Sequence, residues 1–225
     1  MKTAVLLHGY NVNEKNWEYV IWGISPDKPG RIPVAIATAL EEDADFFLLF
    51  GSSMGKGGKS SGKWMKNFLY KRFTDLKKFT VLCALRDFPI DKIRRKIDAT
   101  FELIEGPERP ANTLGELQAM HRLIIERQIQ KLICVSSADH VSRIIRDAFK
   151  IFWGQPIAAH LEVRGSLTLY TEGDGITPPE RASVDHVIVA EPRATVGPYF
   201  ERMFGIRNNT DALADIDAIL KKHGQ

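Results

Sequence analysis

Short apolar runs that alternate with amphipathic helical patterns constrain the fold of this chain more than any other feature of its sequence. The apolar runs occupy residues 3–7, 45–50, about 101–104, 131–136 and 184–190, with two further runs at 157–163 and 166–170. Their length and their content of Val, Ile, Leu and Phe are typical of strands buried on both faces. Such strands, separated by helices, form parallel sheets with a helical layer on each side. The sequence therefore predicts a three-layer, Rossmann-like α/β fold with a mostly parallel sheet.

Amphipathic helical patterns fill the gaps between these runs. They cover residues 33–42, 114–127, 138–151 and 210–222. Pro33 is compatible with the first turn of the first of these helices. An apolar stripe along each pattern predicts a helix that packs one face against the sheet.

One stretch of the chain, residues 56–97, differs from the rest in charge. Between Lys56 and Lys96, thirteen Lys and Arg stand against three acidic residues, whereas the whole chain has a net charge of only +3. We expect a single domain over residues 1–225, in which residues 56–97 form a basic helical insertion or lid at the strand edges. A basic lobe attracts phosphates and acidic small molecules, and a solvated helical face explains the same charges. The aromatic residues of the stretch recur at helical spacing, so we expect them to face the core and do not expect nucleic acid as a partner.

The cysteines and the first apolar run bear on the compartment. Cys83 and Cys134 both lie in apolar runs, as expected of small core residues in a reducing compartment. The N-terminal run stops at His8, so it is too short to span a membrane, and no small-residue cleavage pattern follows it. The His residues are scattered and lack zinc-ligand spacing. We therefore expect a cytoplasmic protein with no membrane segment and no metal site.

Asn112, Thr113 and Glu116 stand where a loop meets the helical pattern at 114–127. Two interpretations fit them. In a capping box, the Thr113 hydroxyl accepts the N–H group three residues on, and Glu116 reaches back to the start of the helix. In a binding site, Asn112 and Glu116 project into a cleft at the strand ends, where open α/β sheets bind ligands. The spacing alone leaves both open.

A second polar group lies where the apolar run 131–136 meets the next helical pattern. Ser136 or Ser137 can cap that helix, and Asp139 complements its dipole. His140 and Arg143 are three residues apart and share a face of the helix. A neutral His in this position suits a base or a hydrogen-bond donor, and Arg can hold a carboxylate or phosphate with two hydrogen bonds. An ordinary surface His explains the same pattern.

Together these two junctions resemble the YdcF-like family, which includes the SanA and ElyC proteins of bacterial envelopes. Its members carry an Asn-Thr-x-x-Asn/Glu helix start and, further along, a strand that ends in Thr-Ser before x-x-His-x-x-Arg. The matching residues here are Asn112, Thr113, Glu116, Ser136, Ser137, His140 and Arg143. Upstream, Gly9 and Arg31 resemble the family's first glycine loop and the Arg before its first helix, and Gly51, Ser52 and Ser53 stand in for its Ser-Gly-Gly.

The resemblance implies a Rossmann-like fold and binding of S-adenosylmethionine, which the name-giving member of the family binds. We therefore expect this chain to bind an anionic, nucleotide-like small molecule at the C-terminal ends of its strands: S-adenosylmethionine, a nucleotide or a nucleotide sugar. Arg31, Arg143 and Lys59 are expected to hold negative groups.

The remaining residues of the pattern are assigned by their chemistry. Asn112 and Thr113 are expected to orient the ligand by hydrogen bonds. Glu116 and His140 are the expected acid–base pair. The small residues of the strand ends, Gly9, Gly51, Ser52, Ser53, Ser136 and Ser137, are expected to line the ligand.

Two other motifs overlap the second strand. Gly51-Ser52-Ser53-Met54-Gly55 satisfies G-x-S-x-G, which favours a serine hydrolase with Ser53 as nucleophile and His140 or His186 as base. A glycine-rich loop follows, in place of the helix that a nucleophile elbow enters directly. The stretch 57–63 contains glycines and lysines but does not fit the phosphate-loop pattern. Its lysines suit a loop that closes over an anionic ligand, or a plain solvated loop. A non-catalytic ligand-binding regulator is the remaining alternative.

Overall fold

The computed structural model describes residues 1–13, 17–51, 59–85, 89–105, 110, 112–153 and 159–168. All of them belong to one compact unit. The predicted strand at 184–190 and the predicted helix at 210–222 lie outside these residues, and so do Ser52 and Ser53. None of the described helices is long and apolar enough to cross a membrane.

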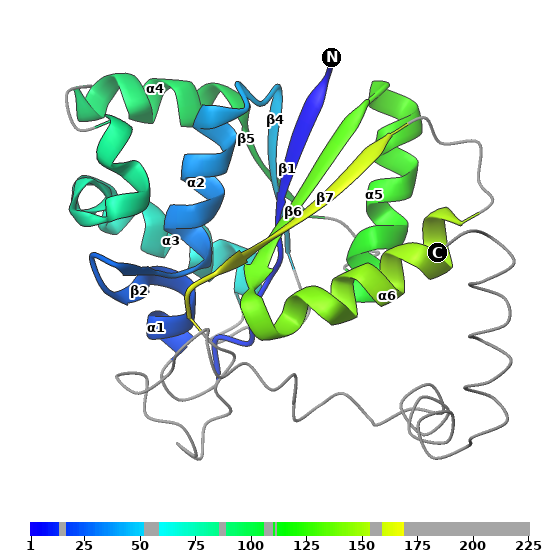
Figure 1. Cartoon of the computed structure of the whole chain (residues 1–225), viewed down its shortest axis with the longest axis horizontal. Helices are drawn as coiled ribbons and strands as arrows, with labels where there is room; N and C mark the ends of the chain where they lie inside the picture. Colours follow the sequence, from blue (N-terminus) through cyan, green and yellow to red (C-terminus); the bar gives the residue numbers. More distant parts are fainter. Residues whose placement is uncertain are drawn as a thin grey trace, which may run out of the picture. The chain divides into compact units, whose positions relative to one another are not determined.

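A sheet of five parallel strands runs through the described part of the chain (Figure 1). In the spatial order β5-β4-β1-β6-β7, the strands span Phe101–Ile104, Phe46–Phe50, Thr3–Leu7, Lys131–Ser137 and His160–Ser166. The first four confirm the strands predicted at 101–104, 45–50, 3–7 and 131–136, each to within one residue. The predicted parallel sheet with helices on both faces is confirmed.

Strand β7 differs from its prediction. The separate runs at 157–163 and 166–170 are one strand within the described residues, and its pairing with β6 continues through Gly165. A Cβ at Gly165 would come within 3.0 Å of the Ala138 Cα. Glycine at this position therefore allows the strand to approach a neighbouring backbone closely and does not mark a turn.

Three of the described helices that connect the strands of this sheet are predicted from the sequence. They are α2 (Arg31–Glu41), α5 (Thr113–Arg127) and α6 (Val141–Phe152). The helix predicted from residue 33 begins at Arg31, so that Pro33 lies in its first turn. The helix predicted from residue 138 opens with a single 3-10 turn, η3 (Ala138–His140), before α6.

A short helix and a hairpin precede α2. Helix α1 (Trp17–Trp22) leads into β2 (Gly23–Ser25), which pairs antiparallel with β3 (Lys28–Pro29). Gly23 has a φ of 118°, a backbone conformation that strongly favours glycine. The hairpin returns the chain to the start of α2.

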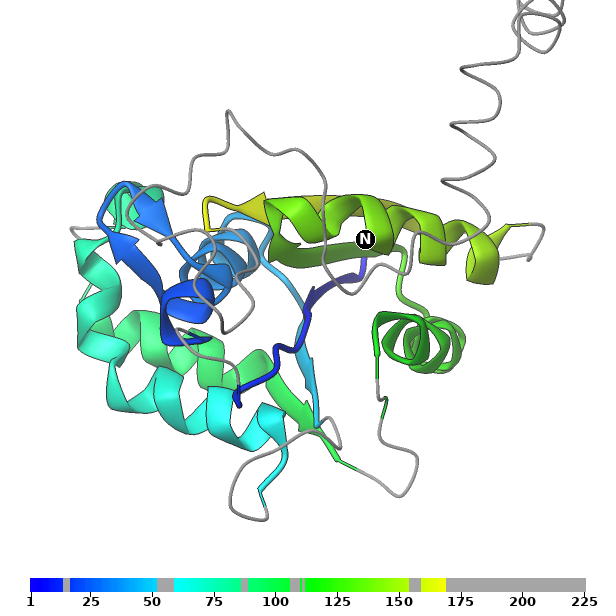
Figure 2. The same cartoon turned by 90° about the horizontal axis from the view of Figure 1, so that it is seen from below.

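The basic segment forms the connection between β4 and its parallel neighbour β5. It contains α3 (Ser61–Lys71), the 3-10 helices η1 (Phe73–Lys78) and η2 (Thr80–Leu85), and α4 (Ile90–Thr100). These helices lie on the same side of the sheet as α2 (Figure 2). Their buried apolar side chains belong to the same cluster as those of α2: Met65, Leu69, Phe73, Leu76, Phe79, Leu82, Ile93 and Ile97. The segment is a helical crossover whose apolar side is part of the core.

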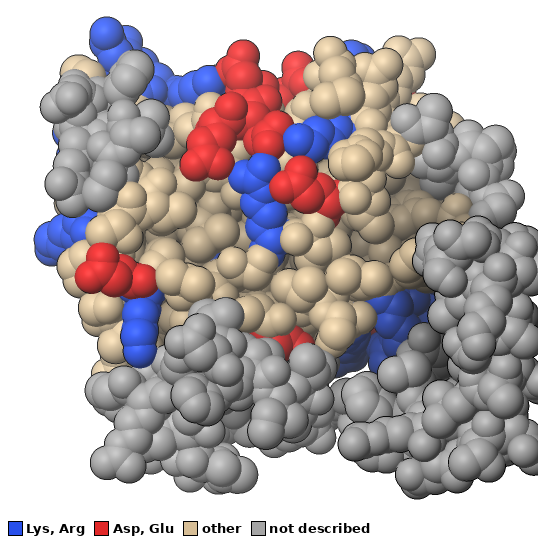
Figure 3. Space-filling model, viewed as in Figure 1, with Lys and Arg blue, Asp and Glu red and all other residues tan. Residues whose placement is uncertain are grey.

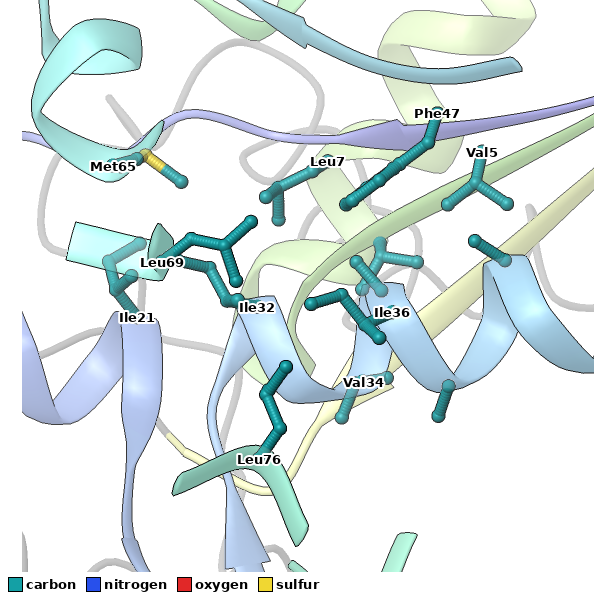
Figure 4. Close-up of a cluster of buried hydrophobic side chains, with 14 of the residues drawn as sticks. Val5, Leu7, Ile21, Ile32, Val34, Ile36, Phe47, Met65, Leu69 and Leu76 are labelled. Carbon is teal, nitrogen blue, oxygen red and sulfur yellow. The ribbon is translucent and has the colours of Figure 1, made fainter. Parts of the chain in front are cut away.

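Two apolar clusters enclose the sheet, and alternate strand residues contribute to each. Val5 and Leu7 of β1 belong to the cluster on the α2 side, where Figure 4 shows Leu7 near Ile32. Ala4 and Leu6 of the same strand belong to the cluster on the α5 and α6 side. Because full burial of a Val, Leu or Ile side chain is worth about 1.5–3 kcal/mol, this alternation fixes which face each residue occupies. It places residue 8, the next along β1, on the α5 side.

The strand order reverses direction between β1 and β6. From β1 the chain moves outward through β4 to β5, and it then crosses to the other side of β1 for β6 and β7. The helical layers change with it, because α2, α3 and α4 cover one face and α5 and α6 cover the other (Figure 2). Open α/β sheets bind ligands at such a topological switch point, beyond the C-terminal strand ends. In this chain the switch point lies where β1 and β6 end.

Ion pairs lie toward the N-terminal ends of the strands, away from the switch point. Arg164 of β7 contacts Glu41 at 3.1 Å, Glu42 at 2.5 Å and Glu162 at 2.6 Å. Lys131 contacts Glu42 at 2.8 Å. Acidic and basic side chains accordingly adjoin on the face shown in Figure 3. These charges pair with one another within the fold and do not form a patch of a single sign.

Candidate functional site

Polar side chains gather at the switch point, where they are almost fully buried. Seven of them are at most 6% exposed: His8, Arg31, Thr113, Glu116, Ser136, Ser137 and His140. They come from the ends of β1 and β6, from the starts of α2 and α5, and from η3. Because a buried polar group is costly without a hydrogen bond, the contacts among these side chains define the site.

The central contact joins His8 and Glu116. The His8 Nδ1 atom lies 2.5 Å from Oε2 of Glu116, and the Gly9 N–H group donates to Oε1 of the same carboxylate at 3.3 Å. His8 faces α5 because side chains alternate along β1. Glu116 lies in the first turn of α5, next to the buried Leu117. A carboxylate that accepts from Nδ1 fixes the orientation and the tautomer of the imidazole ring.

The second ring nitrogen of His8 is buried and has no hydrogen-bond partner among the described residues. With Nδ1–H directed at Glu116, Nε2 carries a lone pair and can accept a proton. Leaving a buried polar atom without a partner costs about 1–3 kcal/mol, so such atoms call for an explanation in function. His8 and Glu116 thus have the arrangement of a general base that is oriented by a carboxylate.

Arg31 holds the loop after β1 against the end of β6. Its Nε atom donates to Ser137 Oγ at 2.8 Å, and its Nη1 atom donates to the carbonyl oxygens of Gly9 at 2.6 Å and His8 at 3.4 Å. The guanidinium also lies over the Tyr10 ring, 5.0 Å from its centroid. Because α2 begins at Arg31, the side chain reaches across the strand ends from the first helical turn. These contacts fix the position of His8.

His140 bridges two hydroxyl groups. Its Nε2 atom lies 2.9 Å from Thr113 Oγ1, and its Nδ1 atom lies 3.1 Å from Ser136 Oγ. Burial lowers the pKa of His140 well below its ordinary value of 6.5, and the positive charge of Arg31 lowers the pKa further. The ring is therefore neutral at pH 7, as expected for a His beside a helix start, and it links the starts of α5 and α6. Its ring centroid lies 6.2 Å from that of His8.

Arg143 lies close enough to His140 to contribute to its lowered pKa. The Arg143 Nε atom is 3.9 Å from Oδ2 of the buried Asp147. Asp147 also contacts Arg146 at 2.8 Å and Lys150 at 3.9 Å. Positive charge on α6 therefore reaches the end of the sheet, and the anion-binding role of Arg143 remains a prediction.

A further polar group occupies the ends of β4 and β5. The Ser60 hydroxyl accepts from the Lys63 N–H group at 3.2 Å and donates to Glu105 at 2.9 Å. A Cβ at Gly51 would come within 3.2 Å of both Ser60 Oγ and Glu105 Cγ. Lys59 precedes this group and is exposed.

Of the two interpretations of the start of α5, the capping box with Thr113 as the N-cap is wrong. Asn112 is the N-cap, and its side chain accepts from the Gly115 N–H group at 2.9 Å. Asn112 has the extended backbone of an N-cap, with φ of −158° and ψ of 174°, whereas Thr113 is already helical. Thr113 and Glu116 are therefore free to contact His140 and His8. The exposed Asn112 caps the helix.

The proposed capping role of Ser136 and Ser137 also needs correction. Ser137 occupies the N-cap position of η3, but its side chain makes no capping hydrogen bond and accepts from Arg31 instead. Ser136 directs its hydroxyl at His140. The strand continues through both residues, so their side chains point to opposite faces of the sheet and meet different partners.

His8 is the residue that motif reasoning did not assign to the site, although it assigned the adjacent Gly9. Ser53, the nucleophile of the serine hydrolase alternative, and His186, one of its two candidate bases, lie outside the described residues. The signal for His8 was present in the sequence, because a His that ends the first strand of a Rossmann-like sheet lies at the switch point. The partner of His8 was not evident, since Glu116 follows it by 108 positions.

Cys134 of β6 lies beneath this site. Burial raises the pKa of its thiol, and the Glu116 carboxylate raises it further. A neutral buried thiol is unreactive. The described residues contain no group of three or more His, Cys, Asp or Glu side chains arranged to hold a metal ion.

Comparison with known proteins identifies no family for this chain. The chain matches no protein-family model, and no curated protein matches its sequence.

Proposed function

We propose that this chain is an enzyme that binds an anionic, nucleotide-like small molecule at the switch point between β1 and β6. His8, oriented by Glu116, acts as its general base. The observation that carries the proposal is the buried Nε2 atom of His8, which has no hydrogen-bond partner among the described residues while Nδ1 contacts Glu116. An atom so placed is available to a bound molecule.

The acid–base pair proposed here differs from the one expected from the motif. His8 takes the place of His140 as the base, and Glu116 becomes the carboxylate that orients it. Both ring nitrogens of His140 face hydroxyl groups, so His140 orients the polar groups of Thr113 and Ser136 around the ligand. His8 removes a proton from water or from a hydroxyl group of the ligand, and Glu116 stabilises the imidazolium that results.

The charge of the proposed ligand follows from the cations around the site. Arg31 and Arg143 both lower the pKa of His140, so their positive charges affect the electrostatic potential at the strand ends. A negative ligand group is favoured there. The nucleotide-like character, the specific proposal of S-adenosylmethionine and the membership of a YdcF-like family rest on the sequence resemblance alone.

A thermal-shift screen tests the ligand class. The full chain is heated with S-adenosylmethionine, nucleotides and nucleotide sugars, and a ligand that binds only the native state raises the melting temperature. We expect at least one of these compounds to stabilise the protein. A panel without any stabilising compound contradicts the proposal.

Catalysis is tested separately by incubating each stabilising compound with the protein and following it by mass spectrometry. We expect product with the wild type and with His160→Ala, an exposed His at the start of β7, but not with His8→Ala. Binding without product identifies a non-catalytic regulator instead. Labelling by a fluorophosphonate that is lost in Ser53→Ala identifies a serine hydrolase.

A further inference from the structure

The Ser61 hydroxyl is a second buried polar group at the strand ends without a described partner. Ser61 is 1% exposed, and its Oγ atom has no hydrogen-bond partner among the described residues. The general base proposed above does not account for it. Native proteins rarely bury a hydroxyl without a hydrogen bond unless a ligand, an ion or water supplies one.

Gly9 places this hydroxyl beside the proposed site. A Cβ at Gly9 would lie 3.2 Å from Glu116 Oε1 and 4.0 Å from Ser61 Oγ. The glycine that follows His8 is thus adjacent both to the carboxylate that orients the base and to the Ser61 hydroxyl. A ligand group held by Ser61 lies next to the loop that carries His8.

Ser61 is also the first residue of α3, a helix of 11 residues. The N-cap side chain of Ser60 accepts from the Lys63 N–H group at 3.2 Å, and the Ser60 carbonyl accepts from the Trp64 N–H group at 3.1 Å. This cap does not use the N–H groups of Ser61 and Gly62, which have no acceptor within the helix. They point out of the positive end of the helix dipole, where anions bind.

We infer that Ser61 and the N-terminus of α3 bind a phosphate group, which makes the ligand a phosphoryl compound. The inference rests on the proposed function and specifies its ligand class. The Ser61 hydroxyl and the N–H groups of Ser61 and Gly62 donate to the phosphate oxygens. The phosphate is thereby held beside Gly9, and the adjacent His8 acts on the same molecule.

Calorimetric titration of the full chain with inorganic phosphate, and with pyrophosphate, tests the inference. We expect saturable binding to the wild type. The affinity of Ser61→Ala for phosphate is expected to be lower by about tenfold or more, since one hydrogen bond to a charged group is lost. Thr100→Val is the control. Its hydroxyl donates to the carbonyl oxygens of Lys96 and Ile97. Thr100 lies just before the N-terminal end of β5, away from the C-terminal strand ends. We therefore expect this variant to bind phosphate as the wild type does.

The melting temperature of Ser61→Ala in phosphate-free buffer provides the second readout. We expect no decrease, because the substitution removes an oxygen without a described partner. A clear decrease means that the hydroxyl has a structural partner and overturns the inference. Equal phosphate affinity in wild type and Ser61→Ala, or no saturable binding to the wild type, also overturns it.

The screen described above separates this failure from failure of the proposed function. A phosphate-free compound such as S-adenosylmethionine that stabilises wild type and Ser61→Ala equally overturns the phosphate inference and leaves the proposed function standing. A screen with no stabilising compound removes the proposed function, and the phosphate titration then decides on the anion site alone.

Discussion

The Nδ1 atom of His8 lies 2.5 Å from Oε2 of Glu116, although the two residues come from different layers of the fold. His8 follows the central strand, and Glu116 lies on a helix that covers one face of the sheet. The contact depends on β1 being the neighbour of β6, because α5 leads into β6. The topology that creates the switch point thereby also assembles the base and its carboxylate.

Replacing His8 removes the proposed general base. In His8→Ala we expect kcat to fall by about 10²–10⁴-fold, the usual contribution of general-base catalysis, with the ligand-induced rise in melting temperature retained. The substrate is the compound identified by the screen, and His160→Ala is the matched control. Unchanged turnover in His8→Ala rules out His8 as the base.

Glu116 acts through His8 as a positioning residue. Glu116→Gln keeps the size of the side chain but removes its negative charge, so the imidazolium formed during turnover is less stable. We expect kcat to fall by roughly 10²-fold with KM nearly unchanged. Steady-state kinetics distinguishes this from a ligand-binding role, in which KM rises and kcat is retained.

His140 makes the stability of the fold depend on pH. Its pKa is lowered in the folded state, so at pH values below about 6.5 the unfolded chain binds a proton that the folded chain does not. The free energy of unfolding therefore decreases as the pH falls from about 6.5 toward the folded pKa. Urea unfolding near pH 7 and near pH 5 measures this decrease.

The contribution of His140 is isolated by His140→Asn. We expect the decrease between the two pH values to be smaller in this variant, by on the order of 1 kcal/mol. His160→Ala, which removes an exposed ring, serves as the control. An equal decrease in wild type and His140→Asn shows that His140 is not the group responsible.

Among the basic residues of the described fold, we expect substitution of Arg31 to cause the largest loss of stability. In Arg31→Lys a single ammonium replaces the planar group that contacts Ser137, Gly9 and His8, so hydrogen bonds at these buried positions are lost. We expect the free energy of unfolding to decrease by about 2–3 kcal/mol. Arg164→Lys, in the partly exposed network of ion pairs away from the switch point, is expected to cost less than about 1 kcal/mol. Urea unfolding that gives equal losses contradicts the role of Arg31 as the residue that holds the loop.

The sequence was informative wherever local patterns decide the outcome. Apolar runs predict β1, β4 and β6 because these strands are almost fully buried, and a shorter run predicts the half-buried β5. The alternation along β1 determines which way His8 points. Residues 112–116 and 136–143 are predicted to lie at the same end of the sheet because parallel strands end together. The pairing of His8 with Glu116 could not be read from these patterns, since it depends on the strand order.

The helix caps are a second feature that the sequence does not fully predict. Asn112 and Thr113 are adjacent and both are good N-cap residues, so the choice between them depends on which one has an extended backbone. That choice decides whether the Thr113 hydroxyl makes the capping hydrogen bond or contacts His140. Ser61 lies in a stretch of glycine, serine and lysine, where no sequence pattern indicates that one hydroxyl will be buried without a partner.

The tautomer of His8 tests the central claim most directly, because it requires no knowledge of the substrate. Nitrogen-15 NMR of the imidazole ring reports which nitrogen carries the proton. We expect the neutral imidazole of the wild type to carry its proton on Nδ1 and a lone pair on Nε2, with a weaker preference for this tautomer in Glu116→Gln. A neutral wild-type ring with its proton on Nε2 would contradict the assignment of His8 as a base oriented by Glu116.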